Sequence, residues 1–165
     1  MFTRIMLFLL VAVGLVGCNR DNFSAQRNQQ GGVDITVTAS ESEVNTLIQN
    51  ALAQSANPLV RNPSVDLQDG QIVISGEHDK RDGSGQRVSG TITAVPSIVN
   101  GRLAIQVTSV NIEGWDANDA RIQEINQKIE EALQGRAVRD NPNVNLTRVT
   151  VTNDSLTFTI STSRG

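Results

Sequence analysis

The chain has 165 residues and a formal net charge of −3 at pH 7, which is the size of one domain with a real core. Mild acidity without a basic stripe argues against nucleic-acid binding and against electrostatic docking on anionic lipids. A single cysteine and a single histidine argue against a disulfide framework and against a zinc site.

The N-terminus has the pattern of a bacterial lipoprotein signal. Arg4 precedes the apolar run Ile5–Val16, which is too short to span a bilayer and leads into Gly17-Cys18. We therefore expect residues 1–17 to be removed and Cys18 to carry acyl chains such as palmitate. Acylated Cys18 would anchor the protein to a membrane, on the extracytoplasmic side of the cell envelope. The alternative is an ordinary signal peptide that is cut elsewhere, or a short anchor.

Residues 18–32 are expected to be the acylated cysteine and a flexible tether, because this segment is polar, lacks an apolar period and ends in Gly-Gly. The folded domain is expected over residues 33–165. It opens with the alternating residues Val33–Thr38, which predict a short strand or an extended lead-in. A helix follows, with Ser40 and Glu43 at the positions of a capping box.

Four strands are expected next, in two hairpins. Their two-residue turns are Asp69-Gly70 and Asn100-Gly101, in which both central positions favour a positive φ. The apolar residues of the fourth strand change faces partway along, which predicts a β-bulge near Thr108-Ser109 and a curved sheet. The four expected strands are Val65–Gln68, Gln71–Gly76, Gln86–Pro96 and Arg102–Ile112.

A second helix is expected to begin near Asp116 or Asn118 and to end at Gly135, because glycine is favoured just after a helix. The predicted fold class is therefore α+β: a curved antiparallel sheet packed on two amphipathic helices, in the order helix, four strands, helix, two strands. The last two strands, joined across Asn153-Asp154, are Val144–Val151 and Leu156–Ile160.

The two helices also resemble each other in sequence. Glu43–Leu52 and Glu124–Leu133 are identical at five of ten positions, and Asn-Pro-x-Val-x-Leu follows each helix, at 62–67 and at 141–146. Convergent helix composition could produce the first match alone. The second match, in the same order, favours a duplicated helix–hairpin unit.

These residues carry a resemblance to a known family. The Ser-Glu-x-Glu-Val-Asn-x-Leu start of the first helix, the Asp-Gly-x-Ile strand and the Asn-Gly-Arg-Leu hairpin at 100–103 are similar to single-domain bacterial members of the TULIP-like (tubular lipid-binding) superfamily. Within this superfamily, the sequence most resembles the LmeA-like phospholipid-binding proteins. The resemblance implies a curved sheet wrapped around long helices, with lipid held in the groove between them. This chain differs in being short, with modest helices.

The apolar stripes of the two helices, spaced at i, i+3 and i+4, are the candidate ligand-binding residues. The other interpretation is a closed core. Asn45 and Asn126 are equivalent in the repeat, and each could hydrogen-bond the backbone or contact a lipid head group. Trp115 could cover the end of the core or insert into head groups. The stripe residues are Val44, Leu47, Ile48, Leu52, Ile122, Ile125, Ile129 and Leu133.

We expect no enzyme, no cofactor and no metal site. The only stretch that combines His, Asp and Ser is residues 77–85, where the residues of a catalytic triad would not converge from separate elements, so a solvated turn is the simpler interpretation. The predicted function is a membrane-anchored lipoprotein that binds a lipid or another hydrophobic ligand in a groove between helices and sheet. The alternative is a structural or protein-interaction lipoprotein of the envelope with a filled core and no ligand.

Overall fold

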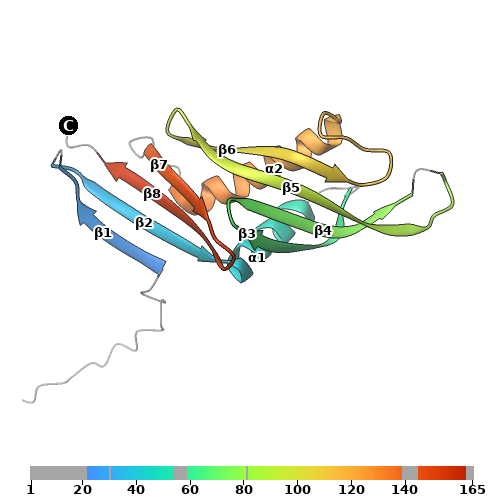
Figure 1. The fold of residues 1–165 in the computed structure, drawn as a ribbon, viewed down its shortest axis with the longest axis horizontal. Helices are drawn as coiled ribbons and strands as arrows, with labels where there is room; N and C mark the ends of the chain where they lie inside the picture. Colours follow the sequence, from blue (N-terminus) through green and yellow to red (C-terminus); the bar gives the residue numbers. More distant parts are fainter. Residues whose placement is uncertain (1–21, 30, 54–58, 81, 139–144, 163–165) are drawn as a thin grey trace, which may run out of the picture.

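The chain folds into eight strands and two helices over the residues that the computed structural model describes, which are 22–29, 31–53, 59–80, 82–138 and 145–162 (Figure 1). No helix in these ranges is both long enough and apolar enough to cross a membrane. The predicted signal segment, Cys18 and residues 141–144 of the repeat lie outside the described residues. The elements are β1 (Phe23–Arg27), β2 (Val33–Ser40), α1 (Glu41–Ala53), β3 (Arg61–Gln68), β4 (Gln71–Asp79), β5 (Arg87–Val99), β6 (Arg102–Asn111), α2 (Ala120–Val138), β7 (Asn145–Val151) and β8 (Ser155–Thr162).

The predicted α+β class and the order of the elements are confirmed. The strands form two four-stranded antiparallel sheets, which we call sheet A (β1-β2-β8-β7) and sheet B (β3-β4-β5-β6). In sheet A the last strand, β8, pairs with β2 along all eight residues of β2. The expected lead-in at Val33–Thr38 is therefore a strand of this sheet.

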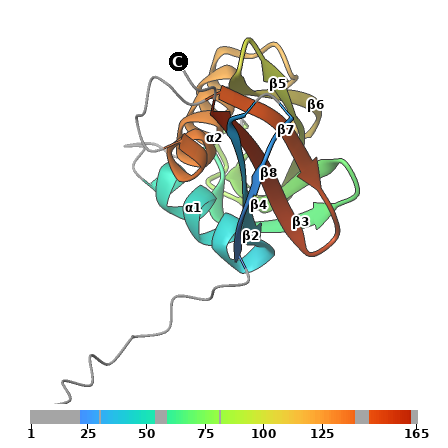
Figure 2. The same ribbon diagram turned by 90° about the vertical axis from the view of Figure 1, so that its left-hand side faces the viewer.

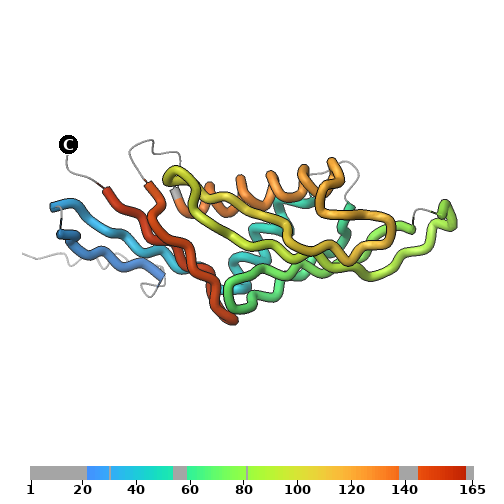
Figure 3. The backbone as a smooth tube through the Cα atoms, turned by 45° about the horizontal axis from the view of Figure 1, so that its top comes forward, coloured from blue at the N-terminus to red at the C-terminus, as the bar shows by residue number. Residues whose placement is uncertain are grey.

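Sheet B and the two helices enclose most of the core. Alternate residues of its strands are buried, among them Ile72 and Ile74 of β4 and Ile92 of β5. α1 contacts the edge strand β3, α2 contacts the opposite edge strand β6, and the helices contact each other (Figure 2). The helices thus connect one edge of the open sheet to the other. Sheet A lies at one end of this unit, and the long β4–β5 hairpin extends at the other (Figure 3).

Side chains of α1 are hydrogen-bonded to the free edge of β3. The backbone N–H of Leu67 donates to Oε2 of Glu41 (2.9 Å), and that of Val65 donates to Oδ1 of Asn45 (3.0 Å). Gln49 continues the series by donating from Nε2 to the carbonyl oxygen of Pro63 (2.9 Å). Four helical residues rise about 6 Å and two strand residues about 6.7 Å, so the two spacings match over the two steps between these three contacts.

α2 repeats this arrangement on β6. The N–H of Leu103 donates to Oε1 of Gln134 (2.8 Å), and the N–H of Ile105 donates to Oε2 of Glu130 (3.1 Å). Each helix runs antiparallel to its edge strand, and the two helices run antiparallel to each other. Arg136 near the end of α2 accordingly lies 3.5 Å from Glu43 near the start of α1.

The turns and the bulge largely follow the predictions. Asn100 and Gly101 both have positive φ, at 52° and 75°, whereas in the first hairpin only Gly70 does (78°). That turn therefore needs one left-handed residue instead of the expected two. On β6 the pairing partners of β5 jump from Ser109 to Val107, which leaves Thr108 as the extra residue. The predicted β-bulge near Thr108-Ser109 is confirmed.

Two boundaries differ from the predictions. Helix α2 does not end at Gly135 but continues to Val138, because Ala137 is buried one turn beyond Leu133 and extends the apolar stripe. Its first turn is capped by neither Asp116 nor Asn118: Oδ1 of Asp119 accepts the N–H of Arg121 (3.0 Å).

The second difference lies in the predicted tether, residues 18–32. Phe23–Arg27 forms strand β1, which pairs with β2 from Phe23↔Val37 to Arg27↔Val33. The turn that follows is held by Asn28, whose Oδ1 accepts the N–H of Gly32 (2.8 Å). The two-residue alternation of Phe-Ser-Ala-Gln was the signal for this strand, and its polar surroundings concealed it.

We predict that Asn45→Ala lowers the free energy of unfolding by about 1–3 kcal/mol, because the N–H of Val65 loses its acceptor at a buried position. Urea unfolding followed by circular dichroism measures the change. Asn50→Ala, on the exposed side of the same helix, is the matched control and should change stability by less than about 0.5 kcal/mol. Equal effects of the two substitutions would contradict a special role for the edge contact.

Candidate functional site

The predicted ligand residues come together in the interior. Seven of the eight stripe residues have exposed fractions of 0–6%, and Leu47 is partly buried against them. They pack with the buried row of sheet B, which includes Ile72, Ile74 and Ile92. The two stripes therefore lie on facing helices, as the sequence predicts. They are members of one packed hydrophobic core.

The three polar or aromatic candidates take different positions. Asn45 hydrogen-bonds the backbone of β3, as one of the two interpretations held. Oδ1 of Asn126 is buried and accepts no hydrogen bond from the described residues. Trp115 is partly buried against the core, and the guanidinium carbon of Arg121 lies 5.0 Å from the centre of its ring. Trp115 thus covers one end of the core.

A groove lies where α1 ends and β3 begins. Its volume is about 660 Å³, within the range of small-molecule sites. Leu52, Ala53, Val60 and Pro63 supply apolar surface, and Arg61 and Arg87 supply positive charge. Leu52 belongs to both the groove and the α1 stripe, so the groove opens at the end of that stripe. The remaining lining residues are Gln49, Asn62 and Ser64.

Local backbone geometry shapes this groove. Asn62 has a positive φ (48°), and the pairing of β3 with β4 is irregular between Arg61 and Ser64. Opposite this irregularity lies Gly76, where a Cβ would approach Cγ1 of Val60 to 2.4 Å and the carbonyl oxygen of Arg61 to 2.8 Å. Glycine at this position lets the start of β3 fold closely over β4 and bring Val60 into the groove wall.

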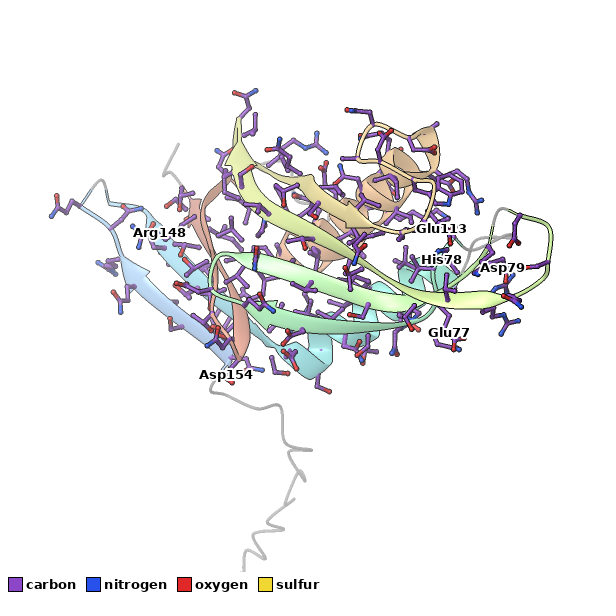
Figure 4. The ribbon with its side chains drawn as sticks, turned by 45° about the vertical axis from the view of Figure 1, so that its right-hand side comes forward. Glu77, His78, Asp79, Glu113, Arg148 and Asp154 are labelled. Atoms are coloured by element: carbon purple, nitrogen blue, oxygen red, sulfur yellow. The ribbon has the colours of Figure 1, made fainter. Side chains whose placement is uncertain are left out.

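The two arginines are positioned by carboxylates of β4. Arg61 donates from Nη2 to Oδ2 of Asp79 (3.1 Å), and Arg87 lies 3.4 Å from Asp79 and 3.9 Å from Glu77. Figure 4 labels the two carboxylate residues, Glu77 and Asp79. The hydrogen bond from Arg61 lowers the pKa of Asp79 below its ordinary value. The carboxylate therefore stays ionised above that pKa and keeps both guanidinium groups at the rim of the groove.

His78 lies between these carboxylates in sequence but faces the other way. Its side chain is only 2% exposed, and neither ring nitrogen has a hydrogen-bond partner among the described residues. It continues the inward row of Ile72, Ile74 and Gly76, next to Gly90. The interpretation of residues 77–85 as a solvated turn is wrong for His78, because β4 extends to Asp79 and carries the histidine into the interior.

A second, smaller pocket of about 310 Å³ lies on the polar face of sheet A. It was not predicted from the sequence. Hydrogen bonds from Ser161 and Asn28 hold Asp34 in this wall and lower the pKa of its carboxyl group. Strand alternation could have located part of it, because Asp34 and Thr36 lie on the side of β2 opposite Ile35 and Val37. Thr147 and Arg148 are neighbours at the irregularity in the pairing of β7 with β8, which alternation does not predict. The lining residues are Gln26, Asp34, Thr36, Thr147, Arg148 and Thr159.

Among the described residues, no group of three or more His, Cys, Asp or Glu side chains could hold a metal ion. In comparisons with known proteins, the family described as LmeA-like phospholipid-binding matches residues 19–161. This match spans both sheets and both helices. No curated protein and no solved structure matches the chain.

We predict that His78→Leu leaves the melting temperature unchanged or raises it. A leucine of similar volume removes two buried nitrogen atoms that have no partner in the described structure, and with them a desolvation cost of about 1–3 kcal/mol. Thermal unfolding monitored by circular dichroism tests this. Ile74→Ala, two residues along the same buried row, should lower the melting temperature clearly. A comparable fall for His78→Leu would show that the imidazole has a partner.

Proposed function

The chain belongs to the LmeA-like phospholipid-binding family, and on that premise we propose that it is an envelope lipoprotein that binds a phospholipid in the groove beside the end of α1. The activity is binding, without a catalytic step. Cys18, acylated after removal of residues 1–17, holds the domain on the extracytoplasmic surface of a membrane. Family membership supports lipid binding, and the sequence pattern before Cys18 supports the anchor.

The observation that carries the groove assignment is its mixed lining. A phospholipid needs apolar surface for its acyl chain and positive charge for its phosphate, and here Leu52 and Val60 lie beside Arg61 and Arg87. The Arg61 and Arg87 side chains are 33% and 53% exposed, so donors remain within reach of a ligand. Guanidinium groups bind phosphate oxygens with paired N–H donors.

The acyl chain binds by partition from water or bilayer. Each buried CH₂ group contributes about 0.8 kcal/mol, so affinity rises with chain length until the groove is filled. Because Leu52 also belongs to the α1 stripe, a longer chain continues toward Ile48 and Val44 and displaces core packing there. The predicted stripe residues therefore act as the inner end of the site only when the two helices separate.

The packed state of the stripes favours the second candidate function. With seven stripe residues at 0–6% exposure, the domain is also suited to a structural or protein-interaction role in the envelope that needs no ligand. The two functions differ in a measurable property. Native mass spectrometry of the intact protein, purified without denaturant, detects a bound phospholipid for the carrier and only the bare chain for the interaction module.

We predict that Ala53→Phe weakens phospholipid binding at least tenfold, because the ring occupies the groove from an exposed position and leaves the core unchanged. Binding is measured with a series of phospholipids of increasing chain length. Asn50→Phe places the same ring on the exposed side of α1, away from the groove, and should bind like the unmodified protein. Equal affinities for both variants would place the ligand elsewhere.

We predict that Arg87→Gln weakens binding of an anionic phospholipid by about fivefold, equivalent to about 1 kcal/mol, because one phosphate-binding guanidinium is lost. Arg148→Gln removes the same charge from the polar face of sheet A and is the control. The difference should shrink at high salt, because the arginine is exposed. Equal losses for both variants would indicate a general charge effect without a specific site.

A further inference from the structure

One edge of sheet A carries an apolar surface that leads out of the core. Cross-strand pairing aligns Phe158 with Val37 and Val37 with Phe23. Phe158 is fully buried, Val37 is partly buried and Phe23 is 60% exposed. The neighbouring row, Ile160, Ile35 and Ala25, shows the same gradient, from buried to exposed. We call Phe23, Ala25, Ile35 and Val37 the edge face.

The opposite side of the same two strands is polar. Ser24 and Gln26 of β1 alternate with the residues of the edge face, and Asp34 and Thr36 do so on β2. Phe23 and Val99 are the two large apolar side chains that are strongly exposed in the described part of the chain. This edge of sheet A is therefore amphipathic, with one apolar and one polar side, as expected for a surface that lies at a membrane interface.

The sequence position of Cys18 identifies the partner of this face. Phe23 follows Cys18 by five residues, which span at most about 18 Å even when fully extended. The connection is shorter than the predicted tether, because β1 takes up residues 23–27. Asn22, just before β1, donates from Nδ2 to Oε2 of Glu43 (3.4 Å) at the start of α1. The chain therefore leaves the domain beside the edge face.

We propose that the edge face lies in the head-group region of the membrane that holds acylated Cys18, with Phe23 inserted and the polar face of sheet A turned to water. The inference rests on the proposed lipid anchor. It gives the domain a fixed orientation on the bilayer instead of free tumbling. The groove then lies at the far end of α1, about 20 Å along the thirteen-residue helix from the end that adjoins sheet A.

Neighbouring positions on β1 provide the test. Ala25 and Gln26 are both exposed and face opposite sides of the sheet. Acylation leaves no free thiol in the mature chain, so Ala25→Cys and Gln26→Cys in the full-length acylated protein each give one site for an environment-sensitive fluorophore. The proteins are reconstituted into phosphatidylcholine–phosphatidylglycerol vesicles that contain a spin-labelled lipid quencher.

We expect the label at Ala25 to be quenched at least threefold more than the label at Gln26, and aqueous iodide to show the reverse order. Equal quenching at the two sites, or stronger lipid quenching at Gln26, would overturn the orientation. Mass spectrometry of the Cys18 peptide from the same samples separates the two proposals. A peptide without acyl groups would overturn the anchor, whereas acylated protein with equal quenching would overturn only the edge face.

Discussion

Sheet B is open, so the outer backbone N–H groups of its edge strands have no carbonyl acceptor on a neighbouring strand. Buried backbone donors need acceptors, and exposed edges invite pairing with other chains. The helices meet both requirements through Glu41 and Asn45 on β3 and through Glu130 and Gln134 on β6. This set of contacts fixes the rotation of each helix about its axis. Because side chains four residues apart point to the strand, the apolar stripe on the adjacent side of each helix must face the interior.

The same constraint determines where open space is left beside the helices. With their orientation fixed by the edge strands, the helices fill the space over sheet B with Ile48, Ile129 and Leu133, all fully buried. Space remains at the end of α1, where the irregular start of β3 leaves the regular sheet. The two helices also contact each other, and at one end of this contact Arg136 of α2 pairs with Glu43 of α1.

The two ends of the molecule differ because sheet A lies at only one of them. It joins the first strand to the last and sits beside the N-terminal end of α1, while the groove lies beside the C-terminal end. In the proposed orientation, the edge face contacts the membrane, and the groove lies at the opposite end of α1.

The sequence by itself determined the class, the order of the elements, both glycine-containing hairpins and the bulge at Thr108, because these depend on residue alternation and turn chemistry within short segments. It also identified the stripes that form the core. It misplaced the end of α2, since Gly135 is a local stop signal that the burial of Ala137 overrides. It missed β1, because a strand of five exposed residues exists only through its pairing with β2.

Only the tertiary structure decided which surfaces remain open. Apolar periodicity is the same for a packed core and for a ligand-lined groove, so the stripes could not reveal that they are buried together. The groove residues Ala53, Val60 and Arg87 come from the end of α1, the residue before β3 and the start of β5. His78 is buried only because β4 continues past the expected turn. These outcomes depend on contacts between segments far apart in the chain. Such contacts produce no recognisable residue pattern within a single segment.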